Sequence, residues 1–137
     1  MGWLTRSHLL MGLLGLLAFV LGGQYMHWAL DGLEGTPPAP RLLYRSAHIY
    51  LLLSSLINLF IGLYLQPATR RSYVWLQGLG GLALLAGPPV LTISFFIESP
   101  AAQLDRPLAA TALYLALAGA VLHVAARLHA WLFTADP

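Results

Sequence analysis

The sequence predicts an all-α integral membrane protein, a bundle of four antiparallel transmembrane helices in up-down-up-down order. Of the 137 residues, 58% are hydrophobic and 9% are charged, against about 25% charged residues in an average soluble domain. The apolar residues also gather into four runs, each close to the roughly 20 residues that a helix needs to cross a bilayer. These runs use most of the chain. We therefore expect a single membrane domain over residues 1–137, with little room for a soluble catalytic domain.

The first predicted helix covers residues 8–30, after a short polar lead. Its apolar part is longer than the h-region of a signal peptide and no small-x-small cleavage site follows it, so we expect the helix to be retained. Gly12, Gly15, Gly22 and Gly23 gather on one side of this helix. Such a side lets the backbone of another helix come close.

The second predicted helix covers residues 42–65 and follows a loop at residues 31–41, where glycines, prolines and acidic residues alternate. Asn58 lies near the middle of this helix. We expect its amide to hydrogen-bond across to another helix, and a contact with a quinone or another substrate is the functional alternative.

The third predicted helix covers residues 73–97 and the fourth covers residues 107–133. Pro88 and Pro89 predict a kink in the third helix, because a proline removes a backbone donor and its ring crowds the preceding turn. Carbonyl groups freed in this way need partners inside a bilayer. Thr92 and Ser94 are candidates for that local repair.

The charged residues predict the orientation of the bundle. Arg70 and Arg71 form a tight basic turn on the side of both chain termini, whereas the acidic residues of the two longer loops fall on the other side. The positive-inside rule therefore favours termini in the cytoplasm. The abundance of leucine, alanine and glycine suggests a bacterial inner membrane.

Several function classes are excluded by what the chain lacks. It has no cysteine, which excludes disulfide exchange, thiolate metal sites and thioether-linked haem. No Asp, Glu or Lys lies within a predicted span, so coupling of transport to protons or sodium through a buried carboxylate has little support. Hydrolase motifs and a phosphate-binding loop are also missing. Seven basic residues are too few and too scattered for a nucleic-acid surface.

The five histidines fall into two groups, each accompanied by arginine. His27 and His48 are expected at the same depth, roughly 5 Å below one membrane boundary, and Arg45 comes three residues before His48. The second group lies near the opposite boundary, with His8 opening the first helix and the remaining residues in the last turns of the fourth helix: His123, Arg127 and His129.

Two neutral imidazoles from different helices suit a b-type haem, and an arginine near the membrane surface can pair with a propionate. The preferred ligand pair is His27 with His48, with Arg45 or Arg41 at the propionates. The weaker pair is His8 with either His123 or His129, next to Arg127. This layout resembles the general plan of four-helix membrane b cytochromes in architecture alone, and it departs from that plan because the third helix carries no histidine. The resemblance implies electron transfer, with quinol as a substrate. No metal other than haem iron is expected, and the scattered methionines argue against copper.

The histidines can also be interpreted without a haem site. Histidines near a membrane boundary can hydrogen-bond headgroups or water without any function, and they can also contact a quinone or a lipid headgroup. The alternative function is a non-catalytic accessory subunit or assembly factor that docks other membrane subunits or forms a homodimer through its glycine and alanine faces. In that case the chain binds no cofactor, and the lack of catalytic motifs leans against an enzyme.

Overall fold

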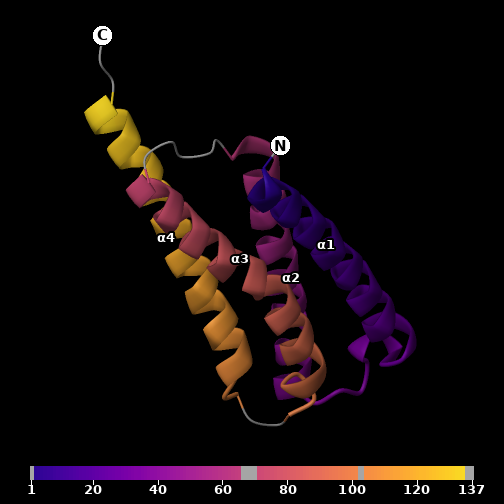
Figure 1. Ribbon diagram of the computed structural model, residues 1–137. Coiled ribbons are helices and arrows are strands. Elements are labelled where there is room, and N and C mark those ends of the chain that lie inside the picture. The colour runs from indigo at the N-terminus through magenta and orange to yellow at the C-terminus, as the bar shows by residue number, and fades with distance from the viewer. Residues whose placement is uncertain (1, 66–70, 102–103, 135–137) are drawn as a thin grey trace.

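The computed structural model describes residues 2–65, 71–101 and 104–134, without the side chains of residues 71, 72, 127 and 129–134. Within these ranges the chain forms four long helices: α1 (Trp3–Trp28), α2 (Pro38–Tyr64), α3 (Arg71–Ile97) and α4 (Pro107–Thr134). All four are long and apolar enough to cross a membrane. The helices run antiparallel to their neighbours in sequence, so that the start of α1 and the end of α4 lie at the same end of the bundle (Figure 1). The predicted four-helix membrane fold is confirmed.

Three helices begin earlier than the sequence predicts, α3 by only two residues. The first starts at Trp3 rather than residue 8, with Gly2 in an extended conformation before it, so most of the short polar lead is helical. The second starts at Pro38 rather than residue 42, because a proline in the first turn lacks only an N–H that would have no helical partner. Between them, a single 3-10 turn at Asp31–Leu33 closes the loop.

The bundle is arranged around α3, which packs closely against α4 and also contacts α2 and α1. On the other side of the molecule, α1 packs along most of α2. Helix α4 meets α2 mainly where Ala109 and Ala112 cluster with Leu51 and with Leu91 of α3. We call the end of the bundle that carries Trp3 and the last turns of α4 the near end, and the end with the loops at residues 29–37 and 98–106 the far end.

The exterior of the bundle is apolar and much of the interior is polar. Large hydrophobic side chains such as Leu10, Leu63 and Leu117 point outward and are about 60% exposed. Ser55 and Asn58 on α2 are completely buried. A bilayer favours this arrangement, because polar groups that face lipid have no partners there. The fold is therefore that of a multi-pass membrane protein.

Pro88 and Pro89 lie inside α3, which continues past them. Pro88 has no N–H to donate to the carbonyl of Leu84, and the side chain of Asn58 on α2 donates to that oxygen instead, at 3.0 Å. The predicted hydrogen bond from Asn58 to another helix is thus confirmed. The hydroxyl of Thr92 donates to the carbonyl of Pro88 and that of Ser94 to Glu98. The prediction that these two hydroxyls satisfy a freed carbonyl was therefore wrong for Leu84, whose partner is Asn58.

Candidate functional site

The structure brings His8 of α1 and His123 of α4 together at the near end of the bundle. Their ring centroids are 6.1 Å apart and the ring planes meet at 75°. Neither ring reaches the surface, since His8 is completely buried and His123 is 8% exposed. We call these two residues the histidine pair. It is the weaker of the two pairs that the sequence suggests.

A short hydrogen-bond chain holds the ring of His8 in place. Its Nδ1 lies 2.7 Å from Oδ1 of Asn58. The amide nitrogen of Asn58 donates in turn to the carbonyls of Ser54, at 2.9 Å, and Leu84, at 3.0 Å. Three helices are therefore tied together behind His8, and the hydrogen bond at Nδ1 helps to orient its ring.

Two adjacent glycines of α3 make room for the histidine pair. A Cβ atom on Gly81 would lie 3.1 Å from Nε2 of His8, and one on Gly80 would lie 3.1 Å from Cδ2 of His123. Both distances are tighter than ordinary contacts. Any other residue at these positions would push on the rings, so the sequence Gly80-Gly81 is part of the site.

The second nitrogen of each ring has no partner. Nε2 of His8 and Nε2 of His123 are both buried and neither makes a hydrogen bond within the described chain. A buried polar group left unpaired costs about 1–3 kcal/mol, and such groups in native proteins call for a physical explanation. The pair therefore has unused bonding capacity for a ligand or a water molecule.

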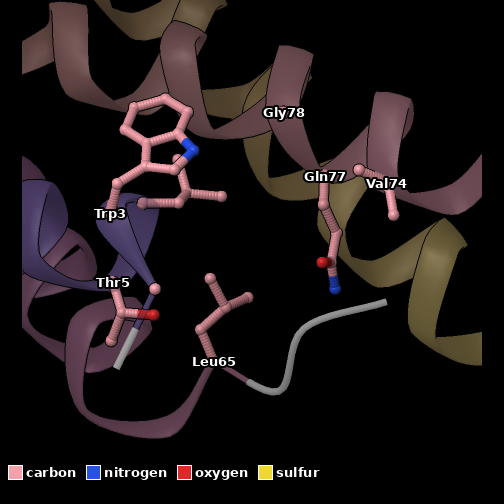
Figure 2. A pocket seen from close by; sticks show the side chains of 8 residues that line it. Trp3, Thr5, Leu65, Val74, Gln77 and Gly78 are labelled. Atoms are coloured by element: carbon pink, nitrogen blue, oxygen red, sulfur yellow. The ribbon is translucent and has the colours of Figure 1, made fainter. Parts of the chain in front are cut away.

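A cavity of about 210 Å³ lies one helical turn from the histidine pair, towards the near end. Figure 2 shows the side chains around it. It opens between the first turns of α1 and α3 and the end of α2. Its walls are largely apolar, and Thr5 and Gln77 supply side-chain polar groups. The residues around it are Gly2, Trp3, Leu4, Thr5, Leu65, Val74, Gln77 and Gly78. Because Thr5 is three residues from His8 and Gln77 is four residues from Gly81, the cavity and the pair share two helix faces.

His27 and His48, the ligand pair that the sequence favours, do not come together as His8 and His123 do. His27 is exposed in the last turn of α1. The ring of His48 stacks on Phe19, with centroids 3.9 Å apart, and lies against Gly22 and Gly23. His48 is thus about one helical turn deeper than His27, because α2 begins earlier than predicted. No ring contact joins the two histidines in the described structure, and the haem prediction for them stays untested.

The remaining predicted residues lie apart from the histidine pair or outside the description. Arg45 is exposed near the start of α2. Arg41 donates to the carbonyl of Thr36, at 2.9 Å. The backbone of Arg127 and His129 belongs to the last turns of α4, and their side chains lie outside the described residues.

A buried carboxylate at the far end was missed by sequence reasoning. Glu98 accepts hydrogen bonds from the N–H groups of Leu108 and Ala109, at 2.6 and 3.0 Å, and from the hydroxyl of Ser94, at 2.6 Å. Burial by itself raises the pKa of Glu98, but these bonds and the charge of Arg106 outweigh it, so the pKa lies below its usual 4.5. Arg106, just before α4, has no side-chain acceptor to cap the helix. The absence of a capping side chain at Arg106 could have indicated that a residue from another segment caps α4.

The histidine pair offers two imidazoles of the kind that ligate haem iron, but the structure leaves no space for a porphyrin beside them. With about 2 Å from a metal to each imidazole nitrogen, two axial imidazoles have ring centroids about 6 Å apart, as observed. A porphyrin, however, extends well beyond its iron in all directions of its plane, and Gly80 and Gly81 bring the backbone of α3 against both rings. Haem would fit only if α1 and α4 moved away from α3.

A bare divalent ion is also poorly matched. Among the described residues, no group of three or more His, Cys, Asp or Glu side chains could hold a metal. The four helices contain no acidic residue, so two positive charges would be buried without compensation at a large cost. The site favours a neutral ligand.

Comparison of the chain with protein-family models, with curated proteins and with solved structures finds no match.

Proposed function

We propose that the protein binds a neutral, membrane-soluble ring compound of the quinone class in the near-end cavity, beside the histidine pair. One observation carries this proposal: an apolar cavity lies one helical turn from two buried imidazoles whose Nε2 atoms have no partner. Ligand sites generally combine apolar walls with a few polar groups that fix orientation. A quinone or quinol has this same division, since its oxygens project from an otherwise apolar ring.

The size and position of the cavity support a ring with a tail. Its volume of about 210 Å³ is below the roughly 300–1,000 Å³ of sites that enclose a drug-sized ligand. A head group fits, while an isoprenoid tail would remain outside. The exposed rings and methyl groups of Trp3 and Val74 lie at the cavity, so a tail leaving it would run along apolar surface into the lipid.

Filling the cavity tests this function. A Cβ atom on Gly78 would meet nothing within 4 Å, so Gly78→Leu places a side chain in the cavity without distorting α3. We expect it to weaken binding of a short-tail quinone at least tenfold, measured by quenching of tryptophan fluorescence in lipid nanodiscs. Ala118→Leu, on the exposed surface of α4, is the matched control and should bind like the unmodified chain. An unchanged affinity for the quinone in Gly78→Leu would contradict the proposal.

A second candidate is a bis-histidine b-type haem that transfers electrons, supported by the 6.1 Å spacing of the histidine pair. An absorption spectrum of the haem-supplemented protein, oxidised and then reduced with dithionite, decides it. Sharp reduced α and β bands that disappear in His8→Ala and His123→Ala would place haem at this pair, whereas loss in His27→Ala and His48→Ala would place it at the far end. A featureless spectrum removes the candidate. If quinone binding also fails, an accessory subunit that docks other membrane proteins or a second copy becomes the leading function.

For the orientation, we propose a bacterial inner-membrane protein with both termini in the cytoplasm, supported by the basic turn at Arg70 and Arg71. The chain has no cysteine, so single cysteines report cleanly on sidedness. In intact cells, a membrane-impermeant maleimide should label Glu34→Cys at the far end but not Gly2→Cys. The opposite labelling would reverse the orientation.

A further inference from the structure

The orientation of the Asn58 amide determines which nitrogen of His8 carries a proton. The two groups that face the amide nitrogen of Asn58 are backbone carbonyls, of Ser54 and Leu84, and carbonyls only accept hydrogen bonds. The NH₂ group must therefore point at them, and Oδ1 must face His8. Since Oδ1 is also only an acceptor, the bond of 2.7 Å requires a hydrogen on Nδ1 of His8.

Proline at position 88 makes this assignment hard to reverse. A flipped Asn58 amide would set its oxygen against the carbonyl of Leu84, which has no helical donor because Pro88 lacks an N–H. Two facing oxygens repel each other and would both remain unpaired in a buried place. The proline in α3 thus fixes the amide in α2, and the amide fixes the ring in α1.

With its proton on Nδ1, a neutral His8 presents a bare lone pair at Nε2. The ring is completely buried and no acidic side chain lies in the four helices, so the neutral form is favoured over the charged one. Nε2 can then accept a hydrogen bond and cannot donate one. His123 lacks such a constraint, because its Nε2 has no hydrogen-bond partner in the described chain.

The side chain of Leu4 borders both the cavity and the surroundings of this lone pair. Leu4 lines the cavity, and its Cδ1 reaches Gly81 beside Nε2 of His8: a Cβ on Gly81 would lie 2.7 Å from the first atom and 3.1 Å from the second. Leu4 is only partly buried. Leu4 thus lies close to both the cavity and Nε2 of His8, and contact between a ligand in the cavity and Nε2 requires this side chain to rotate.

We propose, building on the quinone-class function above, that Nε2 of His8 accepts a hydrogen bond from a ligand hydroxyl, so that the site selects the reduced quinol over the quinone. A quinol hydroxyl donates to the lone pair. A quinone carbonyl oxygen, by contrast, is itself an acceptor, so neither it nor Nε2 of His8 would gain a hydrogen bond from the other. Because leaving a buried acceptor unpaired is costly, the quinol should bind about tenfold more tightly than the quinone.

The test compares three ligands on the unmodified chain in lipid nanodiscs without oxygen. A short-tail quinol, its quinone and the dimethyl ether of the quinol are titrated, the first and third in competition with the quinone that quenches tryptophan fluorescence. The ether keeps the reduced ring but has no hydroxyl to donate. We expect the quinol to bind about tenfold more tightly than either of the others, and the ether to resemble the quinone.

Two variants assign the preference to His8. In His8→Gln, the amide can donate as well as accept, so the ratio of quinol to quinone affinity should fall towards one. His27→Gln makes the same change at an exposed position in the last turn of α1, away from the cavity, and should leave the ratio unchanged. Loss of the preference in His27→Gln but not in His8→Gln would overturn the role of His8. The comparison of ligands needs no variant, so it stands even where His8→Gln fails to fold.

The outcomes separate this inference from the function on which it rests. Equal affinities, or tighter binding of the quinone, together with weakened binding in Gly78→Leu, would overturn the selection of quinol and leave the cavity function in place. Absence of binding by all three ligands would overturn both.

Discussion

The side-chain amide of Asn58 lies 3.0 Å from the carbonyl oxygen of Leu84, and it replaces the helical donor that Pro88 removes. The same side chain accepts the hydrogen bond from His8. One residue thus compensates for a proline in a neighbouring helix and orients the ring beside the cavity. The stability of the bundle and the chemistry of the site are linked through it.

Asn58→Leu should destabilise the protein by about 1–3 kcal/mol, because it leaves Nδ1 of His8 and the carbonyl of Leu84 buried without partners. Pro88→Ala restores the N–H that bonds to Leu84 in a regular helix. In the Pro88→Ala background, Asn58→Leu should therefore lower the free energy of unfolding by less than it does in the unmodified chain. Denaturant unfolding in detergent of the two single variants and the double variant measures the coupling. Strictly additive costs would contradict the proposed repair of Leu84.

Glycines of α3 and α4 should differ sharply in their tolerance of a methyl group. A Cβ on Gly119 would lie 2.7 Å from the carbonyl oxygen of Gly80, and backbone cannot move aside cheaply, so Gly119→Ala should cost about 1–3 kcal/mol. Gly78→Ala meets nothing within 4 Å and should stabilise α3 by about 0.5–1 kcal/mol. Thermal unfolding without ligand compares the two, and equal effects would argue against close packing of α3 on α4.

Glu98 should make stability fall in acid. Its pKa is lowered in the folded protein, so its contribution is complete above its usual value of 4.5 and is lost as the pH falls through the lower folded value. Glu98→Gln should therefore be less stable than the unmodified chain at neutral pH, by about 0.5–2 kcal/mol for a weakened helix cap. The difference should shrink below about pH 4. A constant difference between pH 7 and pH 3 would show that the charge of Glu98 is unimportant.

His48 should be replaceable by an apolar ring. It stacks on Phe19, and its buried Nδ1 has no partner in the described chain, so His48→Phe keeps the stacking and removes an unpaired polar atom. We expect a change in stability of less than about 1 kcal/mol. Measured unfolding that reveals a loss of several kcal/mol would indicate that the imidazole binds a group essential to the fold. His48→Ala, which loses the stacking as well, is the comparison that should be destabilised.

Local sequence was enough for the class of the molecule. Four long apolar stretches must become helices in a bilayer, because their backbone groups can be satisfied only within the segment. The same logic correctly predicted that Asn58 would bond across to another helix. Helix starts at Trp3 and Pro38 were missed, because a first turn needs few of its own hydrogen bonds and leaves a weak signal.

Tertiary packing alone decided which polar residues meet. His8 and His123 are more than a hundred residues apart in sequence, and they face each other because Gly80 and Gly81 let α1 and α4 approach α3 at the same level. His27 and His48, much closer in sequence, diverge because α2 is longer than predicted and carries His48 deeper. Hydropathy determines that a helix crosses the membrane, whereas rotation and depth depend on the side chains of its neighbours. The membrane fold could thus be derived from the sequence, but the histidine pair and its cavity could not.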